Sequence, residues 1–105
     1  MDRIRMLMRY RFTNAFAAAS QAEREKLWEE MGQFAEKWTD AGAKMLSGWV
    51  STAYVDGFDH YVIWDVPGVD TIQQMKNDWL MAETARYTDG DYQIGWAPPW
   101  DPALQ

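Results

Sequence analysis

The alternation of side chains from Arg3 to Phe12 constrains the fold of this chain more than any other feature. Along this stretch every second side chain is apolar, and arginine fills all but one of the positions between them. An alternation with a period of two is typical of a β-strand with one buried face. We therefore predict a strand over Arg3–Phe12. Its apolar face carries Ile4, Met6, Met8, Tyr10 and Phe12, and its other face carries Arg3, Arg5, Leu7, Arg9 and Arg11.

A helix is predicted after a polar and alanine-rich connection over Thr13–Ala19. Ser20 and Glu23 have the spacing of a capping box, in which the hydroxyl and the carboxylate each bind a free backbone N–H group. From there, apolar residues recur every three or four positions, which is the spacing of one helix face. Gly42 is expected to end this helix. The predicted apolar stripe is Leu27, Met31, Phe34, Trp38 and Ala41.

A hairpin is predicted next, with strands over Lys44–Thr52 and His60–Val66 on either side of the turn-forming pair Asp56 and Gly57. Pro67 and Gly68 should end the second of these strands, because proline cannot donate to the ladder.

A second helix and a last strand complete the expected elements. The helix should run from about Asp70 to Arg86, with Gln73 in the capping position. A turn over residues 89–91 and a short strand over Tyr92–Ala97 follow, and the tail after it is rich in proline. The predicted apolar side of the helix is Val69, Ile72, Met75, Trp79 and Ala82.

The resulting order is β-α-β-β-α-β, which is typical of a ferredoxin-like α+β fold. We predict a single domain over residues 1–105, with a four-stranded antiparallel sheet and both helices on one of its faces. The other face would carry Arg5, Arg9, Tyr61 and Asp65, together with apolar residues. This mixture is too aromatic for a purely solvated face, so we expect a homodimer with its sheets face to face. A solvated face is the alternative.

The composition disfavours several functional classes. A formal charge of −6 opposes binding to nucleic acid or to anionic membranes. The chain has no cysteine, and so no disulfide, thiolate nucleophile or cysteine-ligated metal. The first ten residues carry closely spaced charges without an apolar run, so we expect neither a signal peptide nor a membrane span, and a cytoplasmic location. Seven tryptophans and seven methionines indicate burial beyond one small core.

The pattern resembles the dimeric α+β barrel superfamily, which includes cofactor-free monooxygenases, muconolactone-isomerase-like proteins, polyketide cyclases and haem-degrading enzymes. The resemblance covers Arg3 to Trp96 and rests on the element order, the long first helix and the aromatic stretch "YVIWDVP". It implies a ligand cavity between the sheet and the helices of each subunit. The residues that would line this cavity are Met8, Tyr10, Trp38, Trp64 and Trp79, all of which would also suit a plain core.

Two residues are candidates for catalysis. His60 is the only histidine, and histidine side chains serve as acids or bases near neutral pH. It shares a strand face with Val62 and Trp64, but its place at the start of the strand also suits a surface position. Asn77 and Trp79 resemble the amide and indole of quinone-forming monooxygenases, where an amide steadies an oxyanion. Their spacing departs from the family arrangement, because a helix separates them by about 200°.

Metal and haem sites are disfavoured, and we expect no cofactor. The haem-degrading branch usually supplies an axial histidine from the second helix, and residues 73–86 contain none. His60 with Asp56 and Asp59 would offer a metal only one nitrogen ligand, and their sequence is that of an ordinary turn. Ser47 and Ser51 lack the sequence context of a serine nucleophile.

Three functions remain open. The first is an enzyme acting on an apolar, aromatic or polyketide-like substrate, either by cofactor-free oxygenation or by isomerisation or cyclisation. Its logic is that a water-poor cavity with few polar groups can ionise a phenol or enol and stabilise the anion. The second is a module that binds a ligand without turnover. The third is a dimer whose extra aromatic residues serve only assembly.

Overall fold

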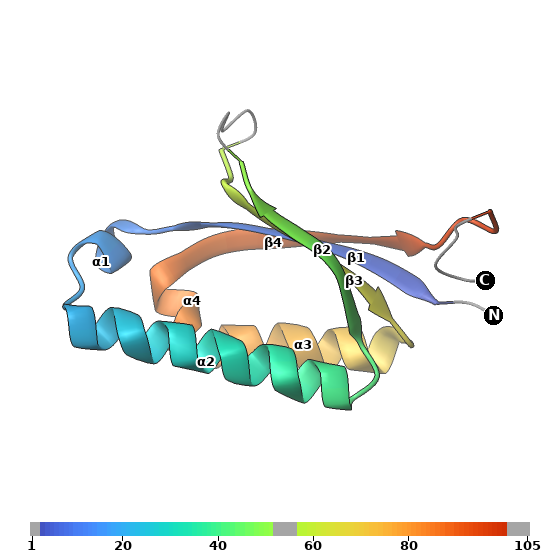
Figure 1. The fold of residues 1–105 in the computed structure, drawn as a ribbon, viewed down its shortest axis with the longest axis horizontal. Helices are drawn as coiled ribbons and strands as arrows, with labels where there is room; N and C mark the ends of the chain where they lie inside the picture. The colour runs from blue at the N-terminus through green and yellow to red at the C-terminus, as the bar shows by residue number, and fades with distance from the viewer. Residues whose placement is uncertain (1–2, 52–56, 101–105) are drawn as a thin grey trace.

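The computed structural model describes residues 3–51 and 57–100. Within these ranges, four strands and four helices follow the order β-α-α-β-β-α-α-β, and Figure 1 shows the sheet above the two longer helices. In chain order they are β1 (Ile4–Phe12), α1 (Asn14–Ala17), α2 (Gln21–Asp40), β2 (Lys44–Val50), β3 (His60–Val66), α3 (Val69–Leu80), α4 (Thr84–Tyr87) and β4 (Thr88–Trp96).

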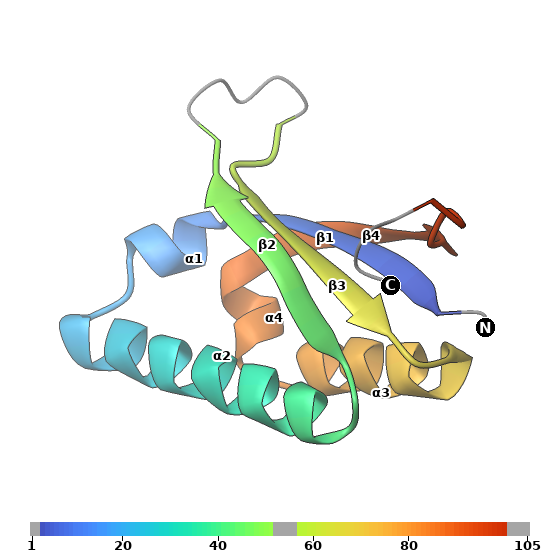
Figure 2. The same ribbon diagram turned by 45° about the vertical axis from the view of Figure 1, so that its right-hand side comes forward.

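The sheet has the strand order β2-β3-β1-β4, and every neighbouring pair is antiparallel. Helices α2 and α3 lie on one face of it, and the opposite face is uncovered in both ribbon views (Figures 1 and 2). The predicted ferredoxin-like α+β fold is therefore confirmed. The predicted alternation is confirmed as well, because Ile4 and Met6 of β1 are buried under the helices while Arg11 is exposed.

The core lies where the middle of the sheet meets α2 and α3. The register aligns Met6 of β1 with Trp64 of β3, and both side chains are almost fully buried. The indole N–H of Trp38 on α2 donates to Asp78 on α3 (2.9 Å), which joins the two helices beneath the sheet. The core cluster consists of Ile4, Met6, Trp38, Ala43, Trp64, Val66, Ile72 and Met75.

Helix α2 begins and ends where the sequence predicts. Glu23 N–H donates to Ser20 Oγ and Ser20 N–H donates to Glu23 Oε1, both at 3.2 Å, so the capping box is formed. Gly42 follows the helix with φ +100°, a backbone conformation that glycine adopts without steric cost. The Thr13–Ala19 connection differs from the prediction only in containing the single helical turn α1.

The predicted second helix begins near Asp70, as expected, but its cap and its length differ from the prediction. Its N-cap is Gly68, with no side-chain cap, so Asp70 and Gln73 do not form the expected capping pair. The helix stops at Leu80, and α4 is a separate element. The cause is a tertiary contact: Thr84 donates to the Glu30 carboxylate of α2 through both its backbone N–H (2.8 Å) and its hydroxyl.

The last strand starts earlier than predicted, because residues 89–91 belong to β4 and do not form a turn. Cross-strand ion pairs explain the difference. Asp91 binds Arg9 through two hydrogen bonds of 2.6 and 2.7 Å, and Asp89 lies 3.6 Å from Arg11. Acidic residues that favour turns in isolation are held in the strand by the arginines opposite them. On the hairpin side, Thr52 and Asp56 lie outside the described residues.

Candidate functional site

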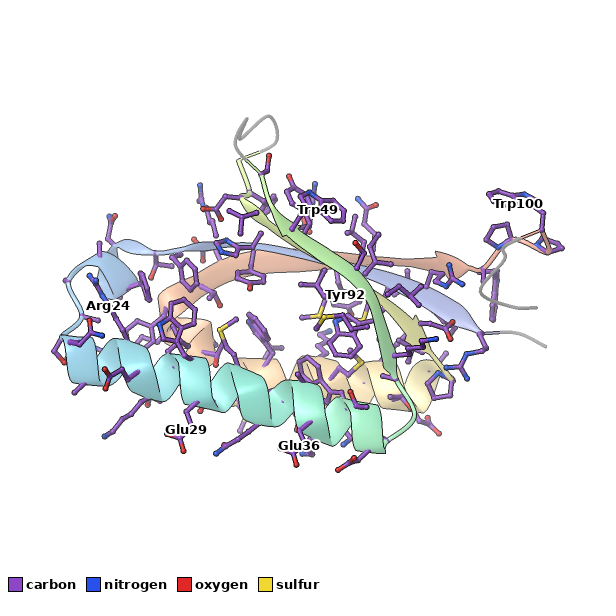
Figure 3. All side chains as sticks on the ribbon, in the orientation of Figure 1. Arg24, Glu29, Glu36, Trp49, Tyr92 and Trp100 are labelled. Carbon is purple, nitrogen blue, oxygen red and sulfur yellow. The ribbon has the colours of Figure 1, made fainter. Side chains whose placement is uncertain are left out.

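Two adjacent pockets lie between the sheet and the helices. The first pocket has a volume of about 300 Å³ and lies between α3 and strands β1 and β4. Figure 3 shows Tyr92 of β4 on this side of the sheet. The first pocket is lined by Met6, Met8, Arg9, Tyr10, Met75, Lys76, Trp79, Leu80, Gly90, Asp91 and Tyr92.

The second pocket has a volume of about 250 Å³ and lies between α2 and strands β1, β2 and β3. All five side chains that sequence analysis placed in a cavity line this pocket. They come together because Met8, Tyr10 and Trp64 share the helix-facing side of the sheet, while the two other tryptophans face it from α2 and α3. The second pocket is lined by Met8, Tyr10, Met31, Gly32, Ala35, Trp38, Met45, Val62, Trp64 and Trp79.

Three side chains, Met8, Tyr10 and Trp79, line both pockets and form the wall between them. The rings of Tyr10 and Trp79 lie 5.4 Å apart, centroid to centroid. The Trp79 indole N–H donates to Thr88 Oγ1 (3.2 Å), and the Thr88 hydroxyl donates to the Thr84 carbonyl (2.8 Å). Trp79 is therefore anchored, through Thr88, to both β4 and α4.

Tyr10 is the polar group most closely associated with both pockets. Burial raises the pKa of its hydroxyl, and the nearby carboxylate of Asp59 raises it further. The hydroxyl forms no hydrogen bond with another residue in the described ranges 3–51 and 57–100. Tyr10 therefore carries a protonated donor at neutral pH, beside both pockets.

His60 packs against the ring of Tyr10 and lines neither pocket. Its ring stacks on Tyr10 with centroids 4.8 Å apart and planes inclined by 16°, and it meets the edge of Phe12 at 4.9 Å. His60 Nδ1 lies 2.7 Å from Asp59 Oδ1, so the preceding residue orients the imidazole. The histidine is partly buried on the face that sequence analysis assigned to it.

Asn77 is exposed on α3 and lines neither pocket, in contrast to Trp79. Its neighbour Lys76 does line the first pocket, and its ammonium lies 5.9 Å from the centre of the Tyr92 ring. Sequence analysis missed Lys76, although it stands one helical turn from both Ile72 and Leu80 on the same face. It also missed Tyr92, because the register that places Tyr92 opposite Met8 depends on the earlier start of β4.

Comparison with known proteins identifies the fold. The chain matches no protein-family model and no curated protein sequence. A mutant chlorite dismutase from Candidatus Nitrospira defluvii superposes with a TM-score of 0.79 at 10% identity, over 97% of this chain and 43% of that one. A heme-binding protein from Thermus thermophilus superposes with a TM-score of 0.70 at 18% identity, over 99% and 47% of the two chains. The chain therefore shares its ferredoxin-like α+β fold with these proteins. It spans less than half the length of these relatives.

A chlorite dismutase structure with bound imidazole gives the same result, with a TM-score of 0.79 at 10% identity, over 97% of this chain and 42% of that one. One of these relatives binds heme, a group that needs an axial ligand from the protein. No histidine lines either pocket, and His60 is engaged with Asp59. The raised pKa of Tyr10 opposes its use as a phenolate ligand. The residues present therefore do not fit a histidine- or tyrosinate-ligated haem.

Residues 3–51 and 57–100 contain neither a metal-binding cluster nor a membrane-spanning helix. Within these ranges, no three histidine or carboxylate side chains gather in a way that could hold a metal ion. None of the helices there is both long enough and apolar enough to cross a membrane.

Proposed function

We propose that this chain is a small-molecule enzyme whose substrate, an apolar aromatic or polyketide-like molecule, binds between the sheet and the helices. The main support is that Met8, Tyr10, Trp38, Trp64 and Trp79 surround one space and do not fill it. The first pocket, about 300 Å³, lies at the lower end of the range for small-molecule sites. That size suits a small ring system better than a macrocycle.

The proposed chemistry is ionisation of a phenol or enol, with its proton passing to solvent water, followed by stabilisation of the anion in the pocket. In an apolar pocket the developing oxyanion needs a hydrogen-bond donor, and such donors contribute strongly where water is excluded. We assign this role to the Tyr10 hydroxyl, because it is protonated at neutral pH and has no partner among the described residues. Lys76 would add a positive charge at the first pocket.

His60 is proposed as a positioning residue that acts through Tyr10. Its ring stacks on the tyrosine, and Asp59 holds the ring in place. The alternative role from sequence analysis, a base that contacts the substrate, requires the substrate to reach past the Tyr10 ring. Asn77 receives no role in this proposal, because it lines neither pocket.

Two reactions fit this chemistry. In a cofactor-free oxygenation, the ionised substrate supplies the electrons to O₂, one oxygen atom enters the product, and the other leaves as water. In an isomerisation or cyclisation, the anion is protonated at another carbon or attacks a carbonyl of the same molecule. We place oxygenation first, as the resemblance implies, and isomerisation or cyclisation second.

The test uses anthrone, an aromatic ketone with an ionisable enol, as the probe substrate. Oxygen uptake and the absorbance of anthraquinone report turnover. Tyr10→Phe should lower kcat about 100-fold, since it removes one oxyanion donor and keeps the ring. Tyr87→Phe is the matched control, because the hydroxyl of Tyr87 binds Glu23 and its ring lines neither pocket.

Three outcomes of this experiment separate the alternatives. Full activity in Tyr10→Phe removes the assigned role of that hydroxyl. Quenching of tryptophan fluorescence by anthrone without turnover supports the binding module instead of the enzyme. Absence of both binding and turnover with anthrone and with 1-naphthol contradicts a small-molecule site. His60→Ala should lower turnover while leaving the fold intact.

We also propose a homodimer through the outer face, by which we mean the sheet face away from the helices. Here the Trp49 and Tyr61 rings stack at 5.2 Å and the Arg9 guanidinium lies 4.6 Å from the centre of the Phe58 ring. Figure 3 shows Trp49 on this side. Asp65 pairs with Arg3 and Arg5. Apolar residues among neutralised charges are suited to burial in an interface.

A further inference from the structure

Of the three side chains in the wall between the two pockets, Tyr10 and Trp79 are held by specific contacts and Met8 is held by apolar packing. Tyr10 is held between His60 and Trp79, with ring centroids 4.8 and 5.4 Å away. Trp79 is held by its hydrogen bond to Thr88. Met8 is partly buried, and only apolar packing holds its unbranched thioether. Methionine changes rotamer at low cost, so Met8 can move while the rings on either side of it stay in place.

The two pockets differ in polarity. Among the residues that line the second pocket, none is charged. Lys76 of α3 lines the first pocket. Arg9 and Asp91 also border it, but their side chains lie on the outer face and bind each other at 2.6 and 2.7 Å. Lys76 forms no ion pair with any residue in the described part of the chain. The first pocket therefore offers a positive charge for an anion, and the second pocket offers only apolar surface.

We infer that the two pockets form one two-lobed site for an amphipathic ligand, with Met8 as the gate between the lobes. The inference rests on the proposed function and specifies its substrate class. An aromatic head with an anionic group, a carboxylate or a phenolate, lies in the first pocket near Lys76. An apolar tail passes Met8 and lies in the second pocket. Met8 thereby determines how long a tail the site accepts.

The test measures binding of 4-ethylbenzoate and 4-hexylbenzoate by isothermal titration calorimetry. Both probes carry the same anionic head, so the ratio of their affinities reports the tail alone. Each methylene that enters apolar surroundings improves Kd by up to about fourfold. Met8→Ala opens the gate and should raise the preference for 4-hexylbenzoate about tenfold. Met8→Leu, which keeps the bulk, should change it less than twofold.

A second variant reduces the volume of the second pocket, where the tail is proposed to lie, from the side of α2. Gly32 of α2 lines the second pocket, and a Cβ atom added there meets no heavy atom within 4 Å. A side chain can therefore begin at position 32 without a clash at its Cβ atom, and Gly32→Leu should lower 4-hexylbenzoate affinity to that of 4-ethylbenzoate. Met81→Ala is the control for loss of a methionine, since Met81 is 87% exposed and lines neither pocket.

The variant Lys76→Gln tests separately whether the anionic head of the ligand lies near Lys76. This variant should weaken both benzoates by a similar factor of about five, the effect of one exposed charge pair at contact distance. The ratio between the two probes should not change. An equal ratio in wild type, Met8→Ala and Gly32→Leu overturns the two-lobed site, and no loss in Lys76→Gln overturns the assigned head. If wild type binds neither these benzoates nor the two aromatic probes of the preceding test, the proposed function itself fails. If Met8→Ala does not fold, Gly32→Leu decides.

Discussion

At the residue scale, the Asp78 carboxylate of α3 joins the two long helices, because it accepts two hydrogen bonds from residues of α2. It accepts a hydrogen bond from the buried indole N–H of Trp38 and another from the exposed ammonium of Lys37, both at 2.9 Å. Only the first should matter for stability, because exposed ion pairs contribute little, whereas a buried donor without a partner is costly.

Asp78→Ala should therefore lower the free energy of unfolding by about 1–3 kcal/mol, measured by urea denaturation followed by tryptophan fluorescence. Asp78→Asn keeps an acceptor for the indole and should cost clearly less. Lys37→Met, which removes only the ion pair, should cost less than about 1 kcal/mol. Equal losses in Asp78→Asn and Asp78→Ala would show that charge, and not the hydrogen bond to Trp38, holds the helices together.

Glu23 makes the stability of the chain depend on pH. The backbone N–H of Ser20, then its hydroxyl, then the Tyr87 hydroxyl donate to this carboxylate and lower its pKa from the usual 4.5. A lowered folded-state pKa means that the carboxylate stabilises the fold above pH 4.5 and that this contribution is lost as the pH falls through the folded-state pKa. The same hydrogen bond raises the pKa of Tyr87, which remains a donor at neutral pH.

The difference in unfolding free energy between wild type and Glu23→Gln should therefore be largest near pH 7 and should shrink progressively below pH 4.5. Denaturation with urea at several pH values between 3 and 7 measures it. Glu29→Gln is the control, because Glu29 lies on the same helix and points away from the sheet (Figure 3). A difference that does not vary with pH would contradict the capping role of the Glu23 charge.

The residues of the site that could be predicted are those for which the periodicity of a strand or a helix determines the face on which the side chain lies. Met8, Tyr10 and Trp64 follow from a period of two, and Trp38 and Trp79 from a period near 3.6, so their convergence could be expected before any tertiary contact was known. Lys76 could have been found from its spacing of four residues from Ile72 and Leu80 on α3, whereas Tyr92 depends on how β4 pairs with β1, which no local pattern determines. The position of His60 behind a neighbouring ring likewise depends on cross-strand packing with Tyr10.

At the element scale, the pairing of β4 with β1 depends on Gly90. A Cβ atom added at Gly90 would lie 2.6 Å from the Arg9 carbonyl oxygen and 2.9 Å from Tyr10 Cβ, so the two strands could not keep their spacing. Gly95 stands on the same strand, and a Cβ atom added there would meet nothing within 4 Å.

Gly90→Ala should thus destabilise the fold by about 1–3 kcal/mol, the usual cost of forcing atoms into packed structure. Gly95→Ala should stay within about 0.5 kcal/mol of wild type. Thermal unfolding followed by circular dichroism compares the two. Equal stability of both variants would mean that β4 moves away from β1 freely, and the walls of the first pocket would then not be rigid.

The elements that could be predicted are those whose ends are marked locally. The capping box of Ser20 and Glu23 and the glycine at position 42 mark both ends of α2, and the structure confirms both. The end of α3 at Leu80 could not be predicted, since it follows from the hydrogen bonds between Thr84 and Glu30, 54 residues apart. Distant carboxylates and arginines likewise decide where β4 begins.

At the scale of the whole molecule, one sheet face is covered by helices and the other is not (Figure 2). On the outer face, Leu7 and Ile63 lie directly opposite each other at the centre of the sheet. Arginine and aspartate pairs flank them, which limits the charge that an interface would have to desolvate. A second copy of the chain presents the same pattern, so two outer faces can bury their apolar centres against each other.

If the chain forms this homodimer, analytical ultracentrifugation at micromolar concentration should give a mass of twice 12.2 kDa. Ile63→Lys should weaken it strongly, because both copies lose a buried side chain worth about 1.5–3 kcal/mol, or about 10²- to 10⁴-fold in Kd for the pair. Val50→Lys is the matched control: Val50 is 62% exposed and lies on the helix-facing side of the same sheet, opposite His60. Circular dichroism checks that each variant keeps its fold. A wild-type chain that sediments as a single copy at high concentration, or an equal effect of the two lysines, would leave the outer face as a solvated surface whose arginines are neutralised within one chain.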